Sequence, residues 1–200
     1  MKSVNIKTYP PPPICEKEIL RYMGVPCDDG RYTDLIRECM ASAVGVLDYK
    51  VCYTELPISV LDDAVDLGFA LVRSDSLRRA LVGCRSIILF AATVGIGMDR
   101  LIVKSAVRSP LYELVSSAIG TERVESFCDE FCRELALDMS RRSCGIRPRF
   151  SPGYGDLPLE LQRDVFRVLD CPKNIGVSIG QSLLMTPQKS VTAIVGIYDL

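Results

Sequence analysis

The residues most able to bind a ligand lie in one short segment, 147–155, with the sequence Arg-Pro-Arg-Phe-Ser-Pro-Gly-Tyr-Gly. An arginine offers a planar fork of donors to a carboxylate or phosphate, and a glycine lets backbone amides approach a ligand. The tyrosine adds a ring face and a hydroxyl. These residue types predict a loop that holds an anionic ligand, and they leave open an ordinary loop between helices with a solvated arginine.

Composition and charge exclude several kinds of chemistry. The 200 residues contain no histidine, which removes the usual general base near neutral pH, the Ser-His-Asp triad and every His-containing zinc or haem site. With 24 basic and 25 acidic residues the net charge is −1. This argues against a positive electrostatic potential over the whole surface that would attract nucleic acid or anionic lipid. Any chemistry must therefore proceed without imidazole, and neither nucleic acid nor membrane is an expected partner.

No membrane span and no secretory signal are predicted. The longest uncharged apolar stretch, 86–98, is shorter than the roughly 20 residues that a helix needs to cross a bilayer. The first seven residues, MKSVNIK, lack the continuous apolar segment of a secretory signal. A cytoplasmic location is therefore expected.

Nine cysteines are scattered along the chain, at positions 15, 27, 39, 52, 84, 128, 132, 144 and 171. An odd number without a regular framework fits reduced thiols, most of them packed in the core. Cys128 and Cys132 can share one face of a helix, but no Cys-x-x-Cys motif is present. Three or four thiolates that converge in space could still form an iron–sulfur site, and a thiol-based redox protein stays as an alternative.

The predicted elements follow an irregular order. Strands are expected at 4–9, 49–60, 84–94 and 190–198, and helices at 16–23, 34–47 behind Thr33 as N-cap, 76–82, 98–143 with breaks at 109–110 and 120–121, and 159–169. A proline connector at 10–13 and a loop at 149–158 join them. This order favours an α+β fold with a mixed or antiparallel sheet and several packed helices, in a single unit spanning 1–200.

A second glycine-containing turn, Gly95-Ile96-Gly97, follows an apolar strand and opens a helical pattern. A phosphate-binding turn is conceivable there, but position 100 of the Gly-x-Gly-x-x-Gly fingerprint is arginine. The spacing therefore favours a tight strand-to-helix turn.

Two motifs occur in a fixed order: Arg149-Phe150-Ser151-Pro152-Gly153-Tyr154, then a predicted helix, then 184–191 with the sequence LMTPQKSV. This pair resembles the C-terminal activation domain of cobalamin-dependent methionine synthase. In that family an Arg-x-x-Pro-Gly-Tyr turn lies in the S-adenosylmethionine site, and a Met-x-Pro-x-x-Ser-Val segment leads into a strand beside it. The resemblance covers the half of the chain at about 122–198, and the chain's length resembles freestanding versions of the domain.

The resemblance implies a set of ligand-binding residues. Arg149 matches the arginine that grips the methionine carboxylate, while Ser151, Gly153 and Tyr154 match the turn that wraps the ligand. Glu125 aligns with a helix glutamate near the ligand, where it could accept hydrogen bonds from the amino group or ribose and complement the sulfonium charge. An exposed helix glutamate is the alternative for this residue.

The sequence departs from the family pattern at two places. Val195 stands near the place of a family tyrosine in the last strand. A family aspartate near the start of the domain has no match between Asn5 and Lys17.

The resemblance implies a repair reaction in methionine biosynthesis. An electron donor, flavodoxin- or ferredoxin-like, reduces inactive cob(II)alamin, and S-adenosylmethionine remethylates the cobalt. The cobalamin would belong to a corrinoid-bearing methionine synthase subunit, since this chain has no cobalamin motif of its own. The alternative is a non-catalytic interaction module that caps or recruits a corrinoid protein.

Overall fold

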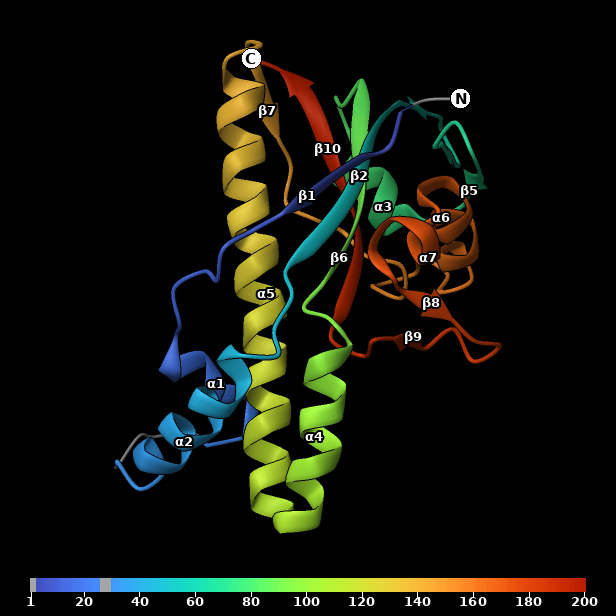
Figure 1. Cartoon of the computed structure of the whole chain (residues 1–200). Helices are drawn as coiled ribbons and strands as arrows, with labels where there is room; N and C mark the ends of the chain where they lie inside the picture. Colours follow the sequence, from blue (N-terminus) through green and yellow to red (C-terminus); the bar gives the residue numbers. More distant parts are fainter. Residues whose placement is uncertain (1–2, 26–29) are drawn as a thin grey trace.

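The computed structural model describes residues 3–25 and 30–200 (Figure 1). The strands in this part are β1 (Asn5–Thr8), β2 (Lys50–Pro57), β3 (Ser59–Val60), β4 (Val65–Asp66), β5 (Leu71–Val72), β6 (Ser86–Thr93), β7 (Cys144–Ile146), β8 (Ser178–Ile179), β9 (Met185–Thr186) and β10 (Ser190–Asp199). The helices are α1 (Glu16–Tyr22), α2 (Thr33–Val44), α3 (Asp75–Ala80), α4 (Ile96–Arg108), α5 (Pro110–Ser140), α6 (Leu161–Leu169) and α7 (Cys171–Ile175). This irregular order confirms the predicted α+β class.

The central sheet has the strand order β1-β2-β6-β10-β7, and every neighbouring pair in it is antiparallel. Its middle strand, β6, is buried along its whole length. Ile88 and Phe90 point into one hydrophobic core, while Ile87 and Leu89 point into a second core on the other face. The unbroken apolar run of β6 follows from this arrangement, because neither face of the strand meets solvent.

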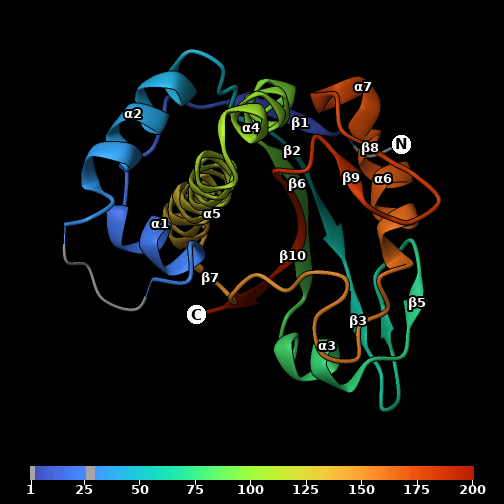
Figure 2. The ribbon, with the colours of Figure 1, turned by 90° about the horizontal axis from the view of Figure 1, so that it is seen from below.

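Helices cover both faces of the sheet (Figures 1 and 2). On one face lie α1, α2, α4 and α5, which enclose the larger core with the sheet. On the other face lie α3, α6 and α7 together with the small three-stranded sheet β3-β4-β5 and the strand pair β8-β9. Of the helices in the described part of the chain, none is both long and apolar enough to cross a membrane.

The longest helix, α5, runs through Gly120 without interruption, so the predicted break at that residue is wrong. A Cβ atom at position 120 would lie 3.0 Å from the Cγ atoms of both Met98 and Lys189. The glycine therefore lets two side chains approach the helix, and it does not end the helix. The predicted break before Pro110 is confirmed, since α4 ends at Arg108.

The start of α2 also differs from the prediction. Thr33 is the first helical residue, and Tyr32 precedes it with helix-like backbone angles and no side-chain capping bond. Thr33 therefore cannot act as the N-cap, because a cap residue needs extended backbone just outside the helix. The helix ends at Val44, three residues before its expected end.

The turn between β6 and α4 confirms the prediction for the second glycine motif. Gly95 precedes α4 with a φ of +86°, a conformation that favours glycine. A Cβ atom on Gly97 would lie 2.3 Å from the carbonyl oxygen of Val46, so the backbones approach closely here. Both glycines thus serve a tight strand-to-helix turn.

A buried ion pair in α5 holds the proline connector. Glu122 and Arg123 each have only 1% of the side chain exposed, and they bond to each other. Arg123 also donates to the carbonyl oxygens of Pro12 and Pro13, both at 2.7 Å. Glu122 accepts a bond of 3.1 Å from the backbone N–H of Cys15, just before α1. The entry to α1 is therefore fixed by charges inside the core.

Candidate functional site

The loop that carries the first motif lies along the first half of β10. Phe150 and Ile194 exchange two backbone hydrogen bonds of 2.8 Å, which pin the start of the loop to the sheet. The backbone N–H of Gly153 then donates to the carbonyl oxygen of Leu157 at 2.9 Å and closes a tight turn. The two motifs of the sequence are therefore neighbours in space.

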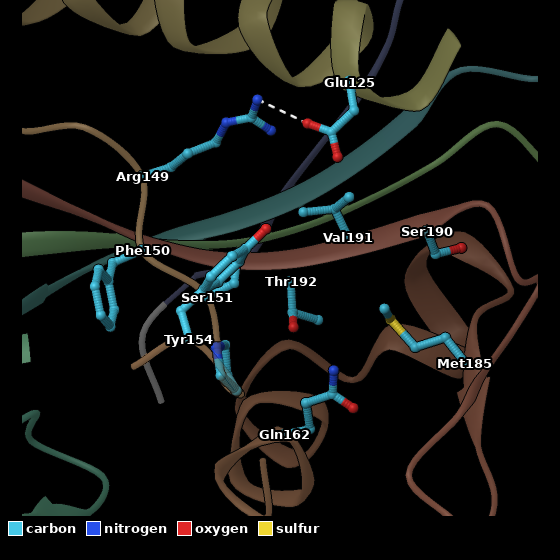
Figure 3. A pocket seen from close by; sticks show the side chains of 11 residues that line it. Glu125, Arg149, Phe150, Ser151, Tyr154, Gln162, Met185, Ser190, Val191 and Thr192 are labelled. Carbon is cyan, nitrogen blue, oxygen red and sulfur yellow. Dashed lines mark ion pairs between the residues drawn. The ribbon is translucent and has the colours of Figure 1, made fainter. Parts of the chain in front are cut away.

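A cavity of about 370 Å³ lies between this loop, α5, α6, β9 and β10 (Figure 3). Its walls come from residues 149–152 and Tyr154 of the loop, Glu125 of α5, Gln162 of α6, Met185 of β9, and residues 190–192 of β10. Ligand pockets in proteins have volumes of about 300–1,000 Å³. The cavity is therefore large enough for a small molecule.

The structure brings four of the five predicted site residues to this cavity: Glu125, Arg149, Ser151 and Tyr154. Tyr154 is 64% exposed, so its ring lies at the mouth of the cavity. Gly153 is not among the wall residues. Its φ of +91° shapes the turn instead, which agrees with a role in the backbone course of the loop.

Arg149 and Glu125 form an ion pair at one end of the cavity (Figure 3). Nη2 of Arg149 lies 2.8 Å from Oε2 of Glu125 and 2.8 Å from Oδ1 of Asp129, one helical turn further along α5. Burial works against the charge on the guanidinium, but Cys128 and the two carboxylates outweigh it and leave the pKa of Arg149 above its ordinary value. A guanidinium has five N–H donors, so Arg149 can bind a ligand anion while keeping both carboxylates.

The thiols next to this ion pair are poorly suited to redox chemistry. Burial raises the pKa of Cys132 to about 11, even though Arg149 acts in the opposite direction. Burial also raises the pKa of Cys128, which has no exposed surface. Since the thiolate is the reactive form of cysteine, both side chains act as packing groups near neutral pH.

Most of the described cysteines are packed in the core, as predicted. Buried thiols occur at Cys39, Cys52, Cys128, Cys144 and Cys171, while Cys15 is exposed and Cys27 lies outside the described residues. Within residues 3–25 and 30–200, no three Cys, Asp or Glu side chains are grouped so as to hold a metal ion. The iron–sulfur alternative therefore has no site in that part of the chain.

Two wall residues that the sequence did not single out carry unsatisfied polar atoms. Oγ1 of Thr192 and Oε1 of Gln162 are buried and have no hydrogen-bond partner among the described residues. Thr192 directly follows the Ser-Val pair of the second motif, so the sequence could have identified it as a candidate site residue. Gln162 lies in the first turn of α6, and no pattern in the sequence marks it.

Val195, which stands near the place of the family tyrosine, is not among the wall residues of the cavity. Its side chain is fully buried in the core between the sheet and α5. Any ligand in the cavity therefore has to be held by other residues of β10.

The curled antiparallel sheet, the long helix across it and the cavity beside the loop define an α+β fold with a ligand-sized pocket at the edge of its central sheet. This is the fold of the MetH reactivation domain. The crystal structure of that domain bound to AdoHcy matches the chain with a TM-score of 0.67 over 98% of this chain and 78% of that one, at 13% sequence identity. No family model matches the chain, and no curated protein matches it in sequence. The resemblance seen in the sequence is thus confirmed for the fold.

The far end of the loop is anchored by Asp156. One carboxylate oxygen accepts bonds from the Ser74 hydroxyl at 2.6 Å and the Ser76 backbone N–H at 3.1 Å, and the other accepts from the backbone N–H of Asp75 at 2.7 Å. The bond from Ser74 and those from the two backbone amides hold the pKa of Asp156 well below its usual range. The loop is therefore tied to the N-terminus of α3.

We expect Asp156→Asn to lower the melting temperature at pH 7, and we expect the difference from the unchanged protein to shrink below about pH 4. A carboxylate with a lowered pKa in the folded state stabilises the protein above the ordinary pKa of aspartate. That stabilisation is lost as the pH falls through the lowered value. Thermal unfolding followed from pH 3 to pH 7 measures this, with the exposed Asp62→Asn as control. Equal pH profiles for the two variants would contradict the anchor.

Proposed function

We propose that this protein binds S-adenosylmethionine and supports the reductive remethylation of cob(II)alamin on a cobalamin-dependent methionine synthase. One observation carries the proposal. Arg149 and Glu125, which the two-motif resemblance places at the ligand, line one cavity in a fold shared with a domain that has been crystallised with AdoHcy. AdoHcy is S-adenosylhomocysteine, the product that S-adenosylmethionine leaves after methyl transfer.

The charges at one end of the cavity suit the amino-acid part of this ligand. The free N–H groups of Arg149 can take the carboxylate in charge-assisted bonds. The second oxygen of Glu125 can accept from the ammonium group or a ribose hydroxyl, and its negative charge offsets the sulfonium. A zwitterion therefore finds both of its counter-charges within one ion pair.

The proposed reaction requires the protein to hold the methyl donor in the correct orientation toward the partner. When bound by a partner subunit, cobalamin would supply the nucleophile for an in-line displacement at the methyl carbon, with the carbon–sulfur bond broken and S-adenosylhomocysteine as the leaving group. No proton is transferred in this step, so a chain without histidine can support it. The work of this chain is to fix the sulfonium so that its methyl group faces the partner.

Partners and location follow from the same proposal. A flavodoxin- or ferredoxin-like donor supplies the electron, and a corrinoid-bearing methionine synthase subunit carries the cobalt. The eight described cysteines are all free thiols, which suits a reducing compartment such as the cytoplasm.

The test combines the full chain with a cob(II)alamin-loaded partner subunit, a reductant and S-adenosylmethionine labelled in its methyl group. The expected result is label on the cobalt that requires all of these components. Binding of S-adenosylmethionine without transfer of label would favour the non-catalytic module that caps or recruits a corrinoid protein. An absence of binding would remove the proposal.

A further inference from the structure

We infer that Gln162 and Thr192 form the end of the cavity that recognises the adenine base, so that this protein selects an adenine over other purines. The inference rests on the proposed function for the identity of the ligand. Its own evidence is that each of these two side chains has a buried oxygen atom without a hydrogen-bond partner among the described residues. The contacts of Arg149 and Glu125 at the other end of the site do not account for this.

Both side chains lie in the wall of the cavity and are buried. Thr192 is 2% exposed and Gln162 is 6% exposed, yet Oγ1 of the first and Oε1 of the second have no hydrogen-bond partner among the described residues. Buried polar atoms are nearly always bonded in native proteins, because burying one without a partner is unfavourable. Two such atoms in the wall of one cavity therefore indicate that its occupant supplies the missing partners.

Their position fits the base and not the amino-acid part of the ligand. Figure 3 shows the carboxamide of Gln162 at the end of the cavity away from Arg149 and Glu125, with the hydroxyl of Thr192 pointing toward it. A ligand whose carboxylate lies on Arg149 would place its other end between these two groups. Gln162 comes from α6 and Thr192 from β10, so the pair holds the far end from two sides.

The chemistry of a carboxamide suits adenine in particular. A glutamine can accept a hydrogen bond from the amino group of adenine and donate one to a ring nitrogen. The hydroxyl of Thr192 can donate or accept and so can serve a further edge atom. Met185, also in the wall, offers a thioether against the face of the base. At the N6/N7 edge, hypoxanthine has a carbonyl oxygen in place of the amino group and so presents two acceptors, which leaves Oε1 of Gln162 without a donor.

The test is a calorimetric titration of the full chain with S-adenosylhomocysteine and with S-inosylhomocysteine, which differ only at this group. We expect the unchanged protein to bind the adenosyl ligand at least about tenfold more tightly, since a site built around a hydrogen bond rejects an analogue that cannot make it. We expect Gln162→Leu to reduce this preference to about threefold or less, and the isosteric Thr192→Val to weaken binding of the adenosyl ligand several-fold.

A control separates binding from folding. Gln162→Leu should melt at the same temperature as the unchanged protein or higher, because it removes an unsatisfied buried group. The exposed Gln181→Leu, outside the cavity wall, should keep the full preference for adenine.

The outcomes distinguish this inference from the proposed function. Tight, Arg149-dependent binding of S-adenosylhomocysteine with an unchanged preference in Gln162→Leu would overturn the inference and leave the function standing. It would mean that water satisfies the two atoms. If the unchanged protein binds neither ligand, the proposed function fails as well.

Discussion

Replacing Arg149 with alanine is expected to weaken the binding of S-adenosylhomocysteine by about 100-fold, or roughly 2.7 kcal/mol. Two effects act together. The variant loses a charge-assisted contact with the ligand carboxylate, and it leaves Glu125 and Asp129 without the cation that now lies 2.8 Å from each. These two carboxylates would then face the carboxylate of the ligand. Isothermal titration calorimetry on the full chain measures the change.

Arg147 provides the matched control two residues earlier in the same segment. It is exposed, lies over the ring of Tyr198 with 4.6 Å between the guanidinium carbon and the ring centroid, and donates to the carbonyl oxygen of Val82. Because it lies outside the cavity wall, Arg147→Ala should bind the ligand as the unchanged protein does. Arg149→Lys should fall between the two, since it keeps the charge but loses the planar fork. Normal binding by Arg149→Ala would contradict the assigned site.

An element could be predicted from the sequence where its own residues show how it is buried. The unbroken apolar run of β6 indicates a strand covered on both faces, and that is its position in the sheet. Gly120 was misread because a glycine inside a helical pattern has the same local signature whether it ends the helix or admits a neighbour. The neighbours that decide the matter, Met98 and Lys189, come from distant parts of the chain.

The same distinction applies to the site. The motif around Arg149 is local, so the family resemblance of this short segment was enough to select Ser151 and Tyr154, which both line the cavity. The pairing of Arg149 with Asp129 could not, because it depends on how the loop lies against α5. Gln162 could not be predicted for the same reason. Only the three-dimensional structure shows that this glutamine of an amphipathic helix lines a cavity.

The buried ion pair of Glu122 and Arg123 should have the largest effect on stability. We expect Glu122→Ala to lower the free energy of unfolding by about 3–5 kcal/mol, because it leaves a charged guanidinium in the core without its counter-charge. Burial disfavours the charge on Arg123, but its contacts with Glu122 more than compensate and raise its pKa. Glu122→Ala removes these contacts, but an arginine keeps its proton in proteins, so the guanidinium stays charged in the variant and bears the penalty of burial. Denaturant unfolding measures the difference.

Two further variants test the physical reason. Replacing both partners, as in Glu122→Leu with Arg123→Met, should recover only part of the loss. A buried pair exchanged for apolar groups is often neutral, but here the carbonyl oxygens of Pro12 and Pro13 and the N–H of Cys15 also lose their partners. Glu130→Ala breaks a largely exposed pair with Arg133 in the same helix and should cost less than about 1 kcal/mol. If Glu122→Ala costs no more than Glu130→Ala, the pair does not stabilise the core.

We expect loss of the Glu122–Arg123 ion pair to affect ligand binding as well, because α1 lies next to both the ion pair and the candidate site. Glu122 holds the entry to α1, and a second hollow of about 290 Å³ beside the cavity is lined by Arg21 and Tyr22 of that helix together with Glu125 and Arg149. Loss of the buried pair should therefore loosen the helix that borders the Arg149–Glu125 ion pair. We expect Glu122→Ala, under conditions where it is still folded, to bind S-adenosylhomocysteine several-fold more weakly, whereas Glu130→Ala binds it normally. Unchanged affinity in folded Glu122→Ala would confine the role of the pair to the stability of the core.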